Sequence, residues 1–99
     1  MVRLLIVLIV LAGGTLSAWA QSFNCRYAKK PTEVAICEYE ELGNLDEEMA
    51  SLYYALPEYA RDDIQDSQAR WLRRRDACGF NYDCIEEAYR RRILFLSNY

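Results

Sequence analysis

Histidine is missing from this 99-residue sequence. It is the side chain that most often serves as a general base, so its absence removes the usual partner of a serine or cysteine nucleophile. Glycosidase chemistry needs two carboxyl groups that face each other across a cleft. The acidic doublets at residues 40–41 and 47–48 are neighbours along the chain instead. The sequence therefore argues against an enzyme.

Glycine and proline are also scarce, with four and two copies, and β-branched residues seldom alternate with polar ones. Turns and strands are thus weakly indicated, and helices are favoured throughout. Pro31 suits the first turn of a short helix that ends near Cys37, with Glu33 complementing the helix dipole. Pro57 is expected to end the next helix or to start the one after it.

Three apolar stripes predict three longer helices. The first comprises Leu42, Leu45, Met49, Leu52 and Leu56; the second, over residues 58–77, comprises Ile64, Gln68, Trp71 and Arg75; the last comprises Ile85, Ala88, Tyr89, Ile93 and Leu96. Short connections make sequential helices antiparallel neighbours. The expected fold is all-α, a small disulfide-stapled antiparallel helical hairpin with a short helix at each end.

The first 20 residues have the order of a secretory signal peptide. Arg3 precedes an apolar run at residues 4–12, and Ala18-Trp19-Ala20 supplies the small-residue cleavage pattern. The run is about nine residues long, against roughly 20 for a membrane-spanning helix, so an uncleaved anchor is the weaker alternative. Gln21, rather than a cysteine, follows the expected cleavage point, which gives no lipoprotein signal. We expect a single helical domain over residues 21–99, exported to the periplasm or secreted.

All four cysteines follow the expected signal peptide. An even number in a short exported domain indicates disulfides, which so small a core usually needs for stability. Closeness along the chain favours Cys25 with Cys37 and Cys78 with Cys84, although four cysteines allow three pairings. A zinc site is the rival interpretation, but the C-x2-C spacing typical of such sites is missing. No metal or cofactor is expected.

Charge is segregated along the chain. Residues 31–66 hold eleven acidic residues against one base, whereas residues 68–99 hold seven arginines and four acidic residues. Without Arg3 the net charge would be −4, which argues against a nucleic-acid partner. The segregation could serve an electrostatically steered protein contact, or it could simply keep the helices soluble.

The stripe over residues 58–77, which includes polar residues, predicts a network of polar contacts between helices. Trp71 is expected in the core rather than as a stacking platform. Arg75 shares its stripe, and a partly buried arginine must find an acceptor. Asp46 on the preceding helix and the adjacent Asp76 are the candidate partners, and Gln68 is expected to join them. The alternative is that Gln68 and Arg75 form a ligand-binding pair.

Six segments, taken in order, resemble the lysozyme inhibitor LprI-like N-terminal domain. They are Phe23-Asn24-Cys25, Glu33-x-x-Ile36-Cys37, Leu42-x-x-Leu45-Asp46 with Tyr53, Gln68-x-x-Trp71-x-x-x-Arg75-Asp76-x-Cys78, Cys84, and Arg92-Ile93-x-x-Leu96. The resemblance covers nearly all of the chain after residue 21 and implies an exported, disulfide-bearing helical protein. The namesake of the family is credited with inhibiting lysozyme, so a lysozyme is the protein partner that the resemblance implies.

Inhibition by contact would need an acidic surface, because C-type lysozymes are strongly basic. The candidate partner-binding residues are Glu40, Glu47, Glu48, Asp62 and Asp63. One alternative is an envelope module that binds another partner without inhibiting anything. Another is a membrane-surface role for the basic and apolar tail at residues 90–96, which the acidic remainder of the domain would oppose on anionic lipid.

Overall fold

The structure, a computed structural model, describes residues 22–99, and within them it contains helices and no strand. The signal peptide expected at residues 1–20 lies outside this described part. The elements are a 3-10 helix η2 (Cys25–Tyr27) and the α-helices α2 (Pro31–Glu38), α3 (Glu40–Ala55), α4 (Glu58–Asp63), α5 (Gln65–Asp76) and α6 (Tyr82–Ser97). The expected all-α class is confirmed.

The helix ends follow local sequence signals. Pro31 occupies the first turn of α2, where its missing N–H is no loss, and Glu33 lies in the same turn. Asn81 caps α6, because its side-chain oxygen accepts a hydrogen bond from the backbone N–H of Cys84 at 3.0 Å. Pro57 precedes α4 and separates it from α3.

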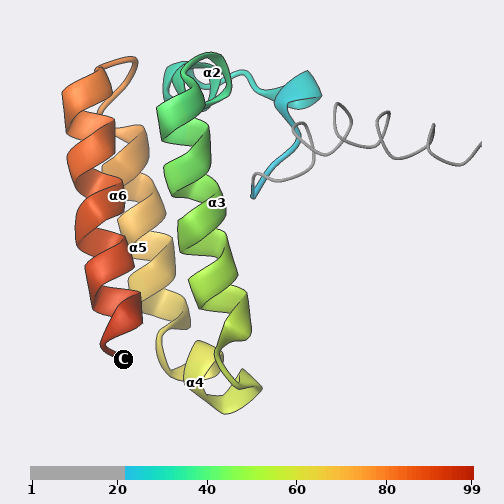
Figure 1. Cartoon of the computed structure of the whole chain (residues 1–99), viewed down its shortest axis with the longest axis vertical. Helices are drawn as coiled ribbons and strands as arrows, with labels where there is room; N and C mark the ends of the chain where they lie inside the picture. Colours follow the sequence, from blue (N-terminus) through green and yellow to red (C-terminus); the bar gives the residue numbers. More distant parts are fainter. Residues whose placement is uncertain (1–21) are drawn as a thin grey trace, which may run out of the picture.

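One expected helix is in fact two. Residues 58–77 were predicted as a single helix, but α4 ends at Asp63 and α5 begins at Gln65. At the junction, Ile64 has φ −107° and ψ 14°, outside the helical region, and its side chain is buried. The apolar stripe of α5 starts only at Ile64, so nothing in the pattern holds residues 58–63 in line with α5. Instead, α4 runs in a different direction from α5 (Figure 1), and Ala60 is its buried residue.

The three long helices α3, α5 and α6 lie side by side, with α4 at one end (Figure 1). The predicted antiparallel hairpin is formed by α5 and α6. The most extensive helix–helix contact, however, joins α3 to α6, and these two helices run in the same direction. α2 packs on α3 and α5 at the other end of the molecule. The hairpin is therefore covered by a third long helix from earlier in the chain.

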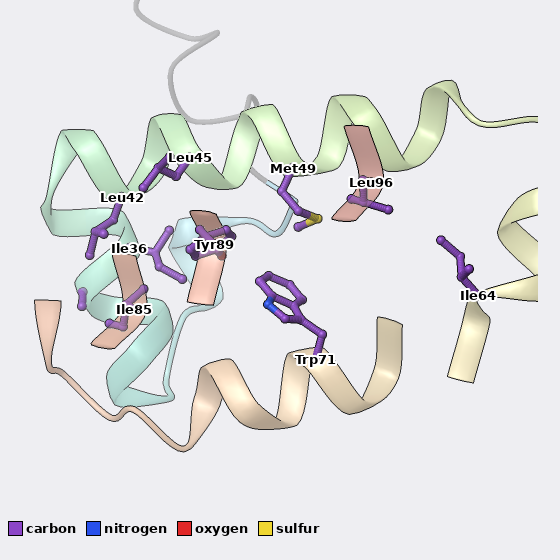
Figure 2. Packing of buried hydrophobic residues seen from close by; sticks show 10 residues of the cluster. Ile36, Leu42, Leu45, Met49, Ile64, Trp71, Ile85, Tyr89 and Leu96 are labelled. Atoms are coloured by element: carbon purple, nitrogen blue, oxygen red, sulfur yellow. The ribbon is translucent and has the colours of Figure 1, made fainter. Parts of the chain in front are cut away.

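Apolar side chains from all three long helices meet in one core (Figure 2). Its members are Ala35, Ile36, Leu42, Leu45, Met49, Ile64, Trp71, Ile85, Tyr89 and Leu96. These include the first three residues of the predicted stripe on α3, while Leu52 and Leu56 are partly buried against the same core. The predicted stripes therefore face inward as expected.

Two disulfides close the ends of this small fold. Cys25 pairs with Cys37, which joins η2 to α2, and Cys78 pairs with Cys84 across the α5–α6 connection. The favoured local pairing is thus confirmed. On the chain-entropy model, loops of this length contribute about 2–3 kcal/mol of stability each. The second bridge confines a turn that needs Gly79, whose φ is +64°.

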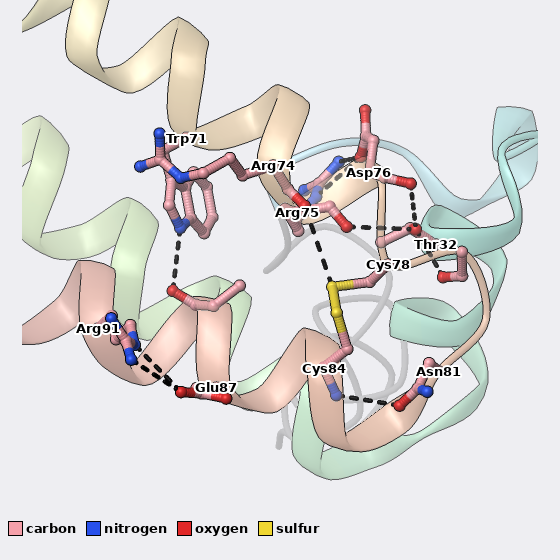
Figure 3. The surroundings of a disulfide bond; sticks show 12 residues. Thr32, Trp71, Arg74, Arg75, Asp76, Cys78, Asn81, Cys84, Glu87 and Arg91 are labelled. Atoms are coloured by element: carbon pink, nitrogen blue, oxygen red, sulfur yellow. Dashed lines mark hydrogen bonds and ion pairs between the residues drawn. A yellow bond between two sulfur atoms is a disulfide. The ribbon is translucent and has the colours of Figure 1, made fainter.

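α2 is fixed to that same turn by a buried threonine. The Thr32 hydroxyl donates to the carbonyl oxygen of Gly79 at 2.6 Å and lies 3.2 Å from that of Asp76 (Figure 3). Carbonyl groups at the end of a helix have no partner within the helix. Thr32 therefore satisfies backbone acceptors at the end of α5 and positions that end next to the charge network described below.

Candidate functional site

A buried chain of polar groups crosses the centre of the molecule. Arg75 on α5 is 2% exposed, and Asp46 on α3 and Tyr89 on α6 are fully buried. Arg75 Nη1 donates to the Tyr89 hydroxyl at 3.0 Å, and that hydroxyl donates to Asp46 Oδ1 at 2.7 Å. Arg75 Nη1 lies 4.0 Å from the same carboxylate oxygen. One ion pair, bridged by a phenol, thus joins the three long helices.

Further partners complete the coordination of both charges. Arg75 Nε and Nη2 donate to Asp76 Oδ1 at 3.0 and 2.7 Å, and Glu33 lies 3.9 Å from Nη2. Asp46 accepts hydrogen bonds from the backbone N–H and the hydroxyl of Ser22 at 2.6 and 2.9 Å. A buried ion pair is tolerable only when its remaining donors and acceptors are satisfied. Here the adjacent Asp76 satisfies two donors of Arg75, and Ser22, distant in the sequence, satisfies Asp46.

The network fixes the protonation states of its members. Burial, together with the negative charge of Asp46, raises the pKa of the Tyr89 hydroxyl, so Tyr89 remains a proton donor. Burial acts to raise the pKa of Asp76, but hydrogen bonds from Arg75 and Lys30 outweigh it and hold the pKa below its ordinary value. Asp76 is therefore a charged acceptor in the folded protein.

Loss of this acceptor in acid is expected to destabilise the fold. Because the folded-state pKa of Asp76 is depressed, its contribution is present above the ordinary aspartate pKa and disappears as the pH falls through the folded-state value. Urea unfolding from neutral pH to about pH 2 should show stability decreasing in that window. Asp76→Asn should flatten this part of the profile, with Asp62→Asn, an exposed site outside the network, as the control. An unchanged slope in Asp76→Asn would contradict the assignment.

Trp71 lies beside this network as a core residue. It is 3% exposed, and its indole N–H donates to the carbonyl oxygen of Ala88 at 2.9 Å (Figure 3). Its ring meets that of Tyr89 edge-on at 5.1 Å. The Arg75 guanidinium lies 5.9 Å from the Trp71 ring and 5.8 Å from the Phe23 ring. Trp71 is therefore part of the core, and only a small part of its side chain reaches the surface.

Gln68 belongs to a different set of contacts from the one expected. Its Oε1 accepts from Arg92 Nε at 2.9 Å, and its Nε2 lies 3.4 Å from the sulfur of Met49. Gln68 and Arg75 do line one groove of about 320 Å³, together with Ser22, Phe23, Glu33, Met49, Ala50, Tyr53, Tyr54 and Leu72. Since Arg75 is already bound to Tyr89 and Asp76, the geometry favours a structural use of the arginine over a ligand-binding pair.

The acidic candidates lie on the surface of two adjoining helices. Glu40, Glu47 and Glu48 are exposed on α3, and Asp62 and Asp63 are exposed on α4. α3 carries no basic residue along its whole length. Together with Glu41 and Glu58 these side chains make the α3–α4 surface acidic, and we call it the acidic surface.

Arg92 is a buried charge that sequence reasoning missed. It is 5% exposed and was not included in the apolar stripe of the last helix. The signal was present: the positions of Ile85, Tyr89, Arg92 and Leu96 step by 4, 3 and 4 residues, which is the period of a buried helical face. An arginine in such a position is a candidate for a buried charge, by the reasoning already used for Arg75.

Two other classes of site find no support in residues 22–99. No group of three or more acidic or cysteine side chains is arranged to hold a metal ion in this part of the chain. Within the same residues, no helix combines the length and the apolar character needed to cross a bilayer.

Comparison with known proteins agrees with the resemblance noted in the sequence. The family model described as lysozyme inhibitor LprI matches residues 25–96. Searches of curated proteins and of solved structures gave no match. The family match spans both disulfides, the charged residues of the buried network and all of α2 to α6 except the last residue of α6. This chain therefore belongs to the lysozyme inhibitor LprI family.

Proposed function

We propose that this protein is an exported binding protein that inhibits a lysozyme by protein–protein contact, with the acidic surface facing the enzyme. The observation that carries the proposal is the family match together with the exposed acidic residues of α3 and α4. The protein supplies no chemistry of its own in this proposal. Occlusion of the substrate cleft is sufficient to stop cell-wall hydrolysis.

Charge complementarity supports this orientation. C-type lysozymes are basic, and complementary fields accelerate association and align the partners before contact. The exposed glutamates of α3 have no basic neighbour on their own helix. The arginines of residues 68–99 lie on α5 and α6, and the molecule therefore has an acidic and a more basic side.

Export is supported by the two disulfides. Disulfides form and persist in the periplasm and outside the cell, where the redox conditions are oxidising. Residues 1–20, which have the order of a signal peptide, supply a route to that compartment. A lysozyme would be encountered in the same place.

The proposal is tested by the lysis of cell walls. The oxidised protein, added in excess to a C-type lysozyme at low ionic strength, should slow the loss of turbidity of a cell-wall suspension. The rival hypothesis, an envelope module without inhibitory activity, predicts full lysis at every salt concentration. Undiminished lysis under these conditions would refute inhibition of C-type enzymes.

Charge reversal on α3 should act mainly on the rate of association. Glu47→Lys with Glu48→Lys is expected to slow binding to a basic lysozyme several-fold at low salt and to change it little at high salt. The reason is screening, because exposed charges lose influence beyond a Debye length of about 8 Å at physiological ionic strength. Stopped-flow or surface-based kinetics over a salt series measure the effect.

A matched control makes the same change of charge elsewhere. Asp83→Lys with Glu87→Lys alters two exposed carboxylates of α6, outside the acidic surface. Equal slowing by the two double variants would show that only net charge matters and would contradict the proposed orientation. Thermal melting of both variants confirms that the fold is retained.

A further inference from the structure

The guanidinium of Arg92 is buried without a counter-charge. Its Nε and Nη2 donate to Gln68 Oε1 and to the Ser67 hydroxyl, each at 2.9 Å, and both acceptors are neutral. No carboxylate of residues 22–99 forms an ion pair with it, whereas Arg75 has carboxylates within 4.0 Å on three sides. Buried charges in folded proteins are ordinarily paired. Arg92 therefore lacks the negatively charged partner that a buried arginine ordinarily has.

A second positive charge lies near Arg92 and adds to the excess of positive charge around it. Burial first, and then the proximity of Arg74, lower the pKa of Arg92, although an arginine stays protonated at any physiological pH. Its Nη1 takes part in none of the hydrogen bonds found in the described chain. An incoming anion would thus meet an unused donor and relieve the repulsion between two cations.

Arg92 lines a groove between α5 and α6, and the groove can admit such an anion. The groove has a volume of about 440 Å³ and is lined by Trp71, Arg74, Cys78, Cys84, Glu87, Ala88, Arg91, Arg92 and Phe95. Figure 3 shows Arg74, Arg91 and Glu87 around the side of Trp71 and the second disulfide. Its volume is within the ordinary range of small-ligand sites, about 300–1,000 Å³.

The charges that face the groove do not cancel. Among its described lining residues Glu87 is the single carboxylate, and it is paired with Arg91, whose Nη2 lies 3.0 Å from Glu87 Oε2. Arg74 and Arg92 remain as cations without a carboxylate partner in residues 22–99. Trp71 and Phe95 supply apolar wall beside them, and the Arg92 guanidinium lies 4.5 Å from the centre of the Phe95 ring.

We propose that this groove binds an acidic peptide segment, with a carboxylate held by Arg92 and Arg74 and a neighbouring apolar side chain packed against Trp71 and Phe95. The fork of a guanidinium matches the two oxygens of a carboxylate. The apolar wall favours an organic carrier over a fully hydrated inorganic ion. No residue of α3 or α4 lines the groove, so the proposal is independent of lysozyme inhibition by the acidic surface.

The direct test is a titration of the protein with an acidic dipeptide and with the matching dipeptide that lacks the negative charge. A blocked leucine–aspartate dipeptide should bind the oxidised protein measurably by calorimetry, and the leucine–asparagine dipeptide should bind at least about tenfold more weakly, as loss of a charge-assisted hydrogen bond predicts. Trp71 is the single tryptophan of residues 22–99, so a change in its fluorescence places the aspartate peptide in the groove. Equal binding of the two dipeptides would overturn the proposal.

Variants of exposed residues keep the test separate from folding. Arg74→Gln should weaken binding of the aspartate peptide several-fold. Glu87→Gln, which frees Arg91 from its ion pair, should strengthen binding of the same peptide. Arg73→Gln is the matched control, because Arg73 is also exposed on α5 but does not line the groove. An affinity unchanged in Arg74→Gln, or inorganic phosphate binding as tightly as the peptide with the same dependence on Arg74, would refute the assignment of a peptide.

Discussion

Arg75→Ala is expected to lower the free energy of unfolding by about 3–5 kcal/mol, the usual cost of removing one partner of a buried ion pair. The change would leave Asp46 fully buried with its negative charge and only Tyr89 and Ser22 as donors. It would also leave the Tyr89 hydroxyl without its donor from α5. Urea unfolding monitored by circular dichroism measures the loss.

The neighbouring arginines supply the control for Arg75. Arg73→Ala removes the same guanidinium from an exposed position of α5 and should change stability by less than about 0.5 kcal/mol. Arg75→Lys should be nearly as damaging as Arg75→Ala, because an ammonium group cannot reproduce the planar fork that contacts Asp76 and Tyr89 at once. Full thermal stability of Arg75→Ala, combined with loss of a binding partner, would show that the arginine serves a ligand instead.

The local elements could be predicted because their causes are local. The spacing of Leu42, Leu45 and Met49 sets the buried face of α3, and a helical period needs no knowledge of what covers it. The cysteines that are close in the chain are also close in space, since short connections keep them together. Pro31 marks the start of α2 for the same kind of reason.

The arrangement of the helices could not be predicted in the same way. The packing of α3 on α6 depends on contacts between distant residues, such as Asp46 and Tyr89, which are 43 positions apart, and no periodic pattern within one helix encodes its neighbour. The break at Ile64 is a similar case. The side chain of Ile64 fits the apolar stripe of a continuous helix, so the pattern gives no sign of the break, on either side of which Ala60 and Ile64 are buried.

The charged residues of the buried network could be predicted from the sequence, but its neutral residues, Tyr89 and Ser22, could not. The placement of Arg75 on a core stripe demanded an acidic partner, and Asp46 and Asp76 are both within reach. The Tyr89 hydroxyl, which bridges Arg75 and Asp46, lies on a residue that sequence patterns treat as apolar. Ser22 contributes from a segment without helical periodicity, so only the folded structure reveals it.

Trp71→Ala is the other change with a large expected effect, a loss of about 3–5 kcal/mol in the free energy of unfolding. Trp71 fills the space between α5 and α6, and α6 also packs on α3. Removal of its ring would leave a cavity between the two helices. The disulfide between Cys78 and Cys84 holds the adjoining helix ends in place, so the helices cannot simply move together to fill it. The edge-on contact with Tyr89 would be lost as well.

Trp71→Phe separates packing from hydrogen bonding at this position. Phenylalanine retains much of the apolar volume but cannot donate to the carbonyl oxygen of Ala88, so it should destabilise less than alanine does, through a smaller cavity and a lost hydrogen bond worth about 1 kcal/mol. Denaturant unfolding of both variants against Leu72→Ala, a partly buried neighbour on the same helix, gives the comparison. If Trp71→Ala cost no more than Leu72→Ala, the indole would not be a central element of the core. The conformation of Tyr89 would then be maintained by its hydrogen bonds with Arg75 and Asp46 rather than by the Trp71 ring.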